Sequence, residues 1–257
     1  MPTLGNTVVP AQGTFNMRTI KEVAKRTPLI PLLYKAFRRF YREKWIGTEG
    51  VFTEIYKGNG WGGRDSVSGR GSTIHQTRKI ARELPALFEA FDISTVLDIP
   101  CGDFYWMKSV DLDNIEYIGA DIVRELIQEN RIKYARDGVN FQHLNLIRDK
   151  LPKVDLILCR DCLVHLSFSD IFSALHNVSS SDAEYFLTTT FVDRHDNPDI
   201  LTGEWRVLNL ERAPFMFPKP LRLLDEECTE DDDNFRDKAL GLWRISDIRE
   251  SLARRGI

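Results

Sequence analysis

Long hydrophobic runs, paired cysteines and an excess of positive charge are all missing from this sequence. No apolar run approaches the roughly 18 to 20 residues of a transmembrane helix, and no apolar signal-peptide segment opens the chain. The 257 residues carry a formal net charge of −3, so no basic field predicts a nucleic-acid partner. The four cysteines are too few and too scattered for a disulfide framework. These absences predict a cytoplasmic protein in a reducing compartment.

Metal binding is the function that the cysteines could still support. Cys159, Cys162 and His165 form a Cys-x2-Cys-x2-His pattern, which is half of a zinc-site pattern. No fourth ligand lies nearby in the sequence. Cys159 also falls at the end of an apolar stretch, where a free cysteine behaves as a small hydrophobic residue. We therefore predict that the protein binds no metal.

The chain divides into an N-terminal segment, residues 1–47, and a main domain, residues 48–257. Between residues 18 and 45, apolar residues recur at helical spacing and alternate with basic ones, which predicts a basic amphipathic helix. Such a helix either packs on its own domain with a solvated basic face, or contacts an anionic membrane surface through residues 28–45. In the second case the protein would be peripheral to a membrane.

A glycine-rich segment, residues 58–72, begins the main domain. Its fifteen residues include six glycines and three serines, a composition typical of a flexible linker. It also contains a tryptophan, two arginines and an aspartate, which linkers rarely carry, and glycines let a backbone approach a ligand closely. A binding loop or lid is the competing interpretation, with Trp61 and Ser68 as candidate substrate-binding residues.

From residue 96 onward, short apolar segments alternate with segments of helical periodicity. This alternation predicts βαβ units and a parallel sheet. Near the end, two apolar segments flank an acidic turn and predict an antiparallel strand pair. The fold class is therefore α/β: a Rossmann-like, doubly wound, mostly parallel seven-stranded sheet with a C-terminal antiparallel strand pair and an N-terminal helical extension. The strands are predicted at residues 96–99, 116–122, 139–146, 154–160, 183–191, 220–227 and 238–245. The helices of the main domain are predicted at residues 73–91, 124–136, 163–177 and 246–255.

The loop after the first strand decides what such a sheet would bind. Asp98 and Asp121 end the first two predicted strands, at the spacing where an acidic residue meets ribose hydroxyls. A dinucleotide loop needs three glycines, but only Gly102 is present; Pro100 and Phe104 occupy the other two positions. Pyrophosphate would be badly bound there. A nucleoside that lacks phosphates and carries a zwitterionic tail suits this loop better.

Four segments in order, VLDIPCGDFYWM, YIGADI, FQHLNL and LILCRDCLVHLS, resemble the class I S-adenosylmethionine-dependent methyltransferases. Together with WGGRDSVSGRGS and GEWRVLNLERAPFMFPKP, they resemble a bacterial subgroup associated with glycan and secondary-metabolite pathways. The resemblance covers about residues 48–245 and implies S-adenosylmethionine as the cofactor. It implies that Asp121 binds the ribose and that Asn145 meets the adenine amine. The implied cofactor-binding residues are Asp98, Pro100, Cys101, Gly102, Asp103, Asp121, Ile122, Asn145 and Arg160.

Asp161 and His165 are the candidate catalytic residues. They lie four positions apart and share a face if the next helix starts early, so that they could take a proton from an attacking hydroxyl. Alternatively, His165 only caps or packs the helix.

The insertion at residues 199–220 is a lid or wall, or else a cover over the edge of the sheet. It mixes aromatic and polar groups as binding sites do, and an arginine-rich wall of Arg160, Arg194 and Arg206 favours an acidic acceptor. The candidate substrate-binding residues of this region are Arg194, Glu204, Trp205 and Arg206.

We therefore predict methyl transfer from S-adenosylmethionine to an oxygen, with nitrogen less favoured, of a small saccharide or acidic acceptor that could be glycan-linked. Two rivals remain open at this stage. One is a nicotinamide-dependent oxidoreductase on the same sheet. The other is a non-catalytic, membrane-associated scaffold that retains the cofactor pocket.

Overall fold

Seven strands form one mixed sheet in the order β3-β2-β1-β4-β5-β7-β6. The structure, a computed structural model, describes residues 46–256. Strands β1 to β5 are parallel, β7 pairs antiparallel with β5, and β6 pairs antiparallel with β7. The predicted fold class is confirmed. The strands are β1 (Thr95–Asp98), β2 (Glu116–Asp121), β3 (Val139–His143), β4 (Leu156–Cys159), β5 (Tyr185–Phe191), β6 (Arg222–Asp225) and β7 (Lys238–Arg244).

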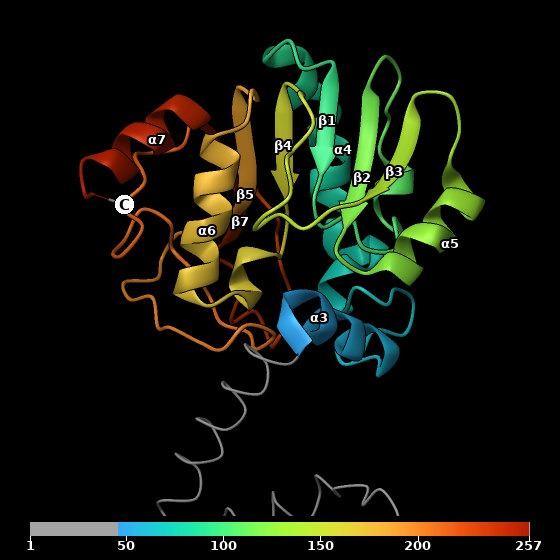
Figure 1. Cartoon of the computed structure of the whole chain (residues 1–257), viewed down its shortest axis with the longest axis horizontal. Helices are drawn as coiled ribbons and strands as arrows, with labels where there is room; N and C mark the ends of the chain where they lie inside the picture. Colours follow the sequence, from blue (N-terminus) through green and yellow to red (C-terminus); the bar gives the residue numbers. More distant parts are fainter. Residues whose placement is uncertain (1–45, 257) are drawn as a thin grey trace, which may run out of the picture. The chain divides into compact units, whose positions relative to one another are not determined.

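Helices cover both faces of the sheet, as Figure 1 shows with α4 behind the strands and α6 in front of them. Buried residues alternate along β1, so that Val96 packs on the α4 side and Leu97 on the α6 side. The two apolar layers together form the core of an α/β sandwich. The α-helices are α3 (Gly47–Lys57), α4 (Ile74–Ala90), α5 (Arg124–Tyr134), α6 (Phe168–Ser179) and α7 (Ile245–Ala253). Short 3-10 helices are η2 (Arg70–Ser72), η3 (Met107–Ser109) and η4 (Leu163–His165).

The helix predicted over residues 163–177 begins later than the sequence pattern indicated. Residues Leu163–His165 form η4, and α6 starts at Phe168. Ser167 is the N-cap, and its side chain accepts a hydrogen bond from the backbone N–H of Asp170. Asp161 has a φ of 52° and is not helical. The prediction that Asp161 and His165 share a helical face is therefore wrong, because the capping serine sets the start of the helix.

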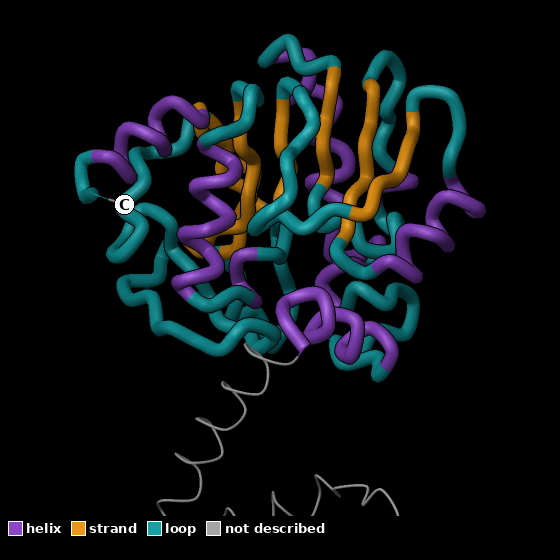
Figure 2. Tube along the Cα trace, viewed as in Figure 1, coloured by secondary structure: helices purple, strands orange, loops and turns teal. Residues whose placement is uncertain are grey.

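The insertion at residues 199–220 forms neither helix nor strand and follows the edge of the domain as a long loop, visible in Figure 2. It nevertheless buries four apolar side chains in the core on the α6 side, and the N–H of Phe191 donates to the carbonyl of Leu208. The interpretation as a cover over the sheet accounts for these contacts. The buried side chains are Leu208, Leu210, Phe215 and Phe217.

The predicted N-terminal helix and its membrane contact through residues 28–45 lie outside the described residues. In the part of the chain that the structure describes, no helix is both long enough and apolar enough to cross a membrane.

Candidate active site

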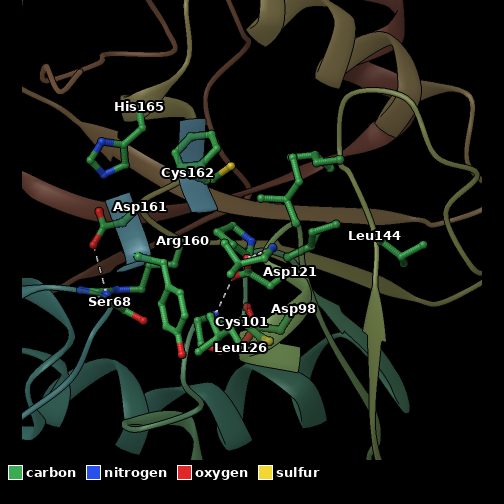
Figure 3. Close-up of a pocket in the computed structure, with 18 of the residues that line it drawn as sticks. Ser68, Asp98, Cys101, Asp121, Leu126, Leu144, Arg160, Asp161, Cys162 and His165 are labelled. Atoms are coloured by element: carbon green, nitrogen blue, oxygen red, sulfur yellow. Dashed lines mark hydrogen bonds and ion pairs between the residues drawn. The ribbon is translucent and has the colours of Figure 1, made fainter. Parts of the chain in front are cut away.

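A cavity opens beyond the carboxyl ends of the parallel strands, where ligands bind in sheets of this type. Helix α3 and the glycine-rich segment cover it from the outside, and α3 lies at this end of the sheet in Figure 1. Three carboxylates line the cavity, those of Asp98, Asp121 and Asp161. The other predicted residues that line it are Trp61, Ser68, Pro100, Cys101, Gly102, Ile122, Asn145, Arg160 and His165. Figure 3 shows Asp98, Cys101 and Asp121 in one part of the cavity and Asp161 and His165 in another.

The loop after β1 bends sharply at Gly102, which has a φ of 54°. Its backbone N–H points at the carboxylate of Asp121, with a nitrogen–oxygen distance of 3.2 Å, and its carbonyl accepts from the side chain of Asn130. Phe104, which stands where the methyltransferase pattern has its third glycine, turns its ring away from the cavity into the core. The altered loop therefore leaves the cavity open.

Asp98 ends β1 with its side chain buried, and the hydroxyl of Tyr117 donates to it at 2.6 Å. Burial raises the pKa of Asp98 to about 7, although the Tyr117 bond and the charge of Arg160 act in the opposite direction. A positively charged ligand group beside it would replace the missing solvation.

Asp121 ends β2, as predicted from the sequence, and it accepts backbone hydrogen bonds from Gly102 and Val123. Burial raises the pKa of Asp121 to about 6, and these backbone donors partly offset that effect. Both carboxylate oxygens are held in fixed directions. This is the arrangement that orients a pair of ligand hydroxyls.

Asn145 follows β3, which ends at His143 instead of continuing to residue 146 as predicted. The Asn145 side-chain oxygen accepts from the backbone N–H of Ile147, and the Asn145 backbone N–H donates to Asp149. These local bonds hold the buried amide at the cavity wall.

Asp103 was predicted to bind the cofactor, but it does not line the cavity. Its carboxylate instead accepts hydrogen bonds from the Ser66 hydroxyl, the Val67 N–H and the Ser68 hydroxyl. The glycine-rich segment is thus bonded to the loop after β1. The segment is therefore a bonded part of the cavity wall and not a flexible linker, while its role as a binding loop or lid stays a prediction.

A cluster of four charged side chains stands at the Asp161 end of the cavity. The Arg160 guanidinium donates to both Glu226 oxygens, at 3.2 and 2.6 Å, and lies 3.1 Å from Asp161. The Lys238 ammonium donates to Asp161 at 2.7 Å and lies 3.4 Å from Glu226. The Arg160 and Lys238 side chains are 4% and 5% exposed, whereas that of Asp161 is 27% exposed. The Asp161 carboxylate is therefore the most exposed of these three groups, and Arg160 lines the cavity with its charge paired to Glu226 and Asp161.

Asp161 remains ionised because of this cluster. Burial alone would raise its pKa, but the charges of Arg160 and Lys238 outweigh burial and hold the pKa well below the usual range. Sequence reasoning missed Glu226 and Lys238. Lys238 opens a strand whose next five residues are uncharged and buried, and a charge at the start of such a strand is the signal that could have identified it.

His165 is held by its Nδ1 atom, which lies 2.9 Å from the carbonyl oxygen of Glu204. Since a carbonyl only accepts, Nδ1 carries the proton and Nε2 keeps a free lone pair in the neutral ring. Burial lowers the pKa of His165 to about 4, against the bond to Glu204 and the charge of Asp161, which raise it. The Trp61 ring covers the imidazole, with ring centroids 4.1 Å apart.

The predicted arginine wall does not exist as a free surface. Arg194 pairs with Asp237 at 2.8 Å, away from the cavity. Arg206 donates to the carbonyls of Leu163, Leu166 and Pro198 and so holds the loop that carries His165. Trp205 and Glu204 do not line the cavity either; the Trp205 ring packs on aromatic side chains, and the Glu204 carbonyl holds His165. These arginines were misassigned because a sequence does not reveal which carboxylates and carbonyls will satisfy them.

The Cys-x2-Cys-x2-His pattern is divided in the structure. Cys159 is buried in β4, while Cys162 and His165 line the cavity. Among residues 46–256, no three His, Cys, Asp or Glu side chains are grouped as metal ligands.

Comparison with solved structures identifies the fold. No protein-family model matches the sequence, and no curated protein matches it. Human N-acetylserotonin methyltransferase in complex with SAM (S-adenosylmethionine) aligns with a TM-score of 0.51 at 14% identity, over 88% of this chain and 69% of that one. The magnesium protoporphyrin IX methyltransferase ChlM from Synechocystis PCC 6803 with bound SAH, the demethylated product, aligns with a TM-score of 0.43 at 13% identity, over 56% and 72%. The second likeness is too weak to argue from. The first shows that the chain has the Rossmann-like methyltransferase fold.

Proposed function

We propose that this protein is a methyltransferase that uses S-adenosylmethionine and methylates a hydroxyl group of a small acceptor. The observation that carries the proposal is the charge of the cavity at the carboxyl edge of a methyltransferase-type sheet. Three carboxylates line it, and its arginine, Arg160, is paired with Glu226 and Asp161. Such a cavity favours a ligand with positive charges and hydroxyl groups over one with a pyrophosphate.

We assign one group of the cavity to each part of S-adenosylmethionine. Asp121 would accept from the ribose hydroxyls, and the bent backbone at Gly102 would lie against the amino-acid end. Asn145 would meet the adenine amine. When bound, the cofactor supplies a methyl group on a sulfonium, which is already an activated leaving group. The protein mainly has to align the acceptor, and alignment can lower a barrier by roughly 7–11 kcal/mol.

His165 is the proposed general base. The acceptor O–H bond would break, the proton would pass to Nε2, and the oxygen would form its new bond to the methyl carbon as the carbon–sulfur electron pair returns to sulfur. The Glu204 carbonyl keeps Nδ1 protonated, which leaves Nε2 as the basic atom. Asp161, fixed by Lys238, would stabilise the imidazolium that results.

The charges around the cavity also limit which acceptors we propose. An anionic acceptor would meet the Asp161 carboxylate, while the arginines predicted to bind it are paired or turned away. A neutral hydroxylic acceptor avoids this repulsion. The resemblance to a glycan-associated subgroup makes a saccharide hydroxyl our first choice and a nitrogen acceptor the second.

The experiment is a transfer assay with methyl-labelled S-adenosylmethionine and saccharides that differ in one group, a hydroxyl, a carboxylate or an amine. We expect labelled product with the hydroxyl compounds and one equivalent of SAH per methyl transferred. His165→Gln should lower the rate by about 10²- to 10⁴-fold, whereas His195→Gln, at an exposed histidine, should not. Full activity in His165→Gln, or transfer only to the carboxylates, would contradict the assignment.

The two rivals are less well supported. A nicotinamide cofactor would need cationic or backbone partners for its pyrophosphate, and the cavity offers carboxylates instead. The scaffold hypothesis depends on residues 28–45, and vesicle binding by the intact protein would test it.

A further inference from the structure

Residues 61–72, which we call the roof segment, line one side of the cavity. They contact the surrounding domain at three points. Trp61, Val67, Ser68 and Ser72 from this segment are cavity-lining residues. The three contacts are Trp61 with His165, Ser66 to Ser68 with Asp103, and Gly71 with Arg160. The roof segment thus joins the base, the cofactor loop and the charged cluster.

The middle contact is the most densely bonded of the three. The Asp103 carboxylate accepts from the Ser66 hydroxyl at 2.9 Å, the Val67 N–H at 3.0 Å and the Ser68 hydroxyl at 3.3 Å. The Asp103 N–H donates back to the Ser68 oxygen at 3.2 Å. Hydrogen bonds to a charged acceptor are stronger than neutral ones. One side chain therefore fastens three consecutive residues of the roof segment.

Two glycines allow the close backbone approaches within the roof segment and between it and the loop after β1. A Cβ atom at Gly102 would stand 2.1 Å from the Ser68 hydroxyl oxygen, and one at Gly63 would stand 1.8 Å from the carbonyl oxygen of Ser66. Neither position has room for a side chain. The glycine of the cofactor loop thus serves the roof segment as well as the ligand.

The end of the roof segment at Trp61 faces the base. Trp61 lies with its ring centroid 4.1 Å from that of His165 at an interplanar angle of 41°. An aromatic ring at this distance shields the imidazole from water, which favours the neutral form of His165. Trp61 lies five residues before Ser66, so its position depends on how firmly the serines are held.

We propose that Asp103 is a positioning residue that fastens the roof segment through Ser66 and Ser68 and so holds Trp61 against the face of His165. This proposal rests on the proposed function for its catalytic meaning but not for its geometry. Asp103 then acts through the roof segment and does not bind the cofactor itself. The variant Ser66→Ala distinguishes a positioning role of Asp103 from direct cofactor binding, because Ser66 is 2% exposed and does not line the cavity.

The first test needs no activity. The pKa of the His165 ring is measured by NMR titration in the full-length protein, with His165→Gln used to assign the signal. Asp161, Arg206 and Lys238 are the charged groups that act on this ring, together with the Glu204 carbonyl that bonds it. None of them is altered by Ser66→Ala or Asp103→Asn.

We expect both variants to raise the pKa of His165, because a loosened Trp61 admits water to the ring. Asp103→Asn removes a negative charge, which alone would lower that pKa, so a rise cannot be a direct charge effect. Asp111→Asn, at an exposed aspartate that follows the same loop, should leave it unchanged. An unchanged pKa in both roof variants would overturn the proposal.

The second test measures the dissociation rate of SAH. We expect Ser66→Ala and Asp103→Asn each to raise it by about tenfold, equivalent to ~1.4 kcal/mol, and the double variant to add little beyond either. If only Asp103→Asn raises the rate, Asp103 is a direct ligand and the proposal fails. If the wild-type protein binds no SAH, the proposed function fails, while the NMR comparison still decides the role of Asp103.

Discussion

The ammonium of Lys238 donates to the carboxylate of Asp161 at 2.7 Å, although 77 residues separate them in the chain. The contact joins the first residue of β7, the antiparallel strand, to the loop after β4. Arg160 approaches the same carboxylate oxygen at 3.1 Å. The site's exposed carboxylate is therefore held in its ionised form and in one direction by two buried cations.

Lys238→Met should be strongly destabilising. The variant leaves the carboxylates of Asp161 and Glu226 with Arg160 as their remaining neighbouring cation, and breaking a buried ion pair from one side typically costs about 3–5 kcal/mol. The free energy of unfolding, measured by urea denaturation, checks this. Combining it with Glu226→Gln removes the excess negative charge and should recover part of the loss. Lys133→Met, at an exposed ion pair on α5, should change nothing measurable; an equal loss there would refute a special role for the buried cluster.

The stability of the protein should depend on His165 in mildly acidic solution. The pKa of this ring is lowered from 6.5 to about 4 in the folded state. Between these values the unfolded chain binds a proton that the folded chain does not, so the His165 contribution to stability falls as the pH falls. Because the ring is partly exposed to the cavity, we expect a loss on the order of 2 kcal/mol, at ~1.4 kcal/mol per pKa unit.

The measurement compares wild type with His165→Gln by urea denaturation at pH 7 and at pH 4. As the solution is acidified, the free energy of unfolding of the variant should rise relative to that of the wild type. The raised pKa values of Asp98 and Asp121 act in the opposite direction but are common to both proteins, so they cancel in the difference. A pH-independent difference would mean that His165 titrates normally in the folded protein.

Gly102→Ala should be costlier than the same change at Gly138. Both glycines have positive φ angles, 54° and 72°, so both variants carry backbone strain of about 1–2 kcal/mol. A Cβ at Gly138 would meet its nearest atom at 3.6 Å, whereas one at Gly102 would overlap the Ser68 hydroxyl. We expect a further ~1–3 kcal/mol at Gly102 from overpacking. Adding Ser68→Gly should recover that excess, and failure to recover it would refute the close approach.

Phe104→Ala should destabilise the fold without weakening cofactor binding by the folded protein. The Phe104 ring is fully buried among Tyr117, Tyr134 and Phe141, at centroid distances of 5.2 to 5.3 Å. Its removal should cost about 3–5 kcal/mol. Denaturation tests the expected loss of stability, and SAH titration of the folded fraction tests the expected unchanged affinity. A loss of affinity with no loss of stability would place the ring in the binding site.

The strand pattern could be predicted because apolar runs and their spacing are local. Asp98 and Asp121 were found in this way, since each ends a strand and the topology of a parallel sheet brings such ends together. The fold class followed from the same alternation. The start of α6 was missed because one capping residue, Ser167, overrides the apolar period.

The side-chain partners could not be predicted. Arg194 and Arg206 look like ligand-binding cations in the sequence, yet each is satisfied by groups of its own chain. Asp103 looks like part of the cofactor loop and instead bonds the roof segment. Glu226 meets both Arg160 and Lys238 only because β6 and β7 pair antiparallel. Each of these outcomes depends on long-range contacts that no sequence period encodes.

The central claim, that the cavity binds S-adenosylmethionine with Asp121 on the ribose, is tested most directly by calorimetric titration. The purified protein is titrated with S-adenosylmethionine, with SAH and with NAD, and Asp121→Ala is titrated in parallel. The account predicts binding of the first two and not of NAD, and a loss of at least ~1.4 kcal/mol, tenfold in affinity, in the variant. Binding of NAD alone, or binding of neither methyl donor nor SAH by the folded protein, would contradict it.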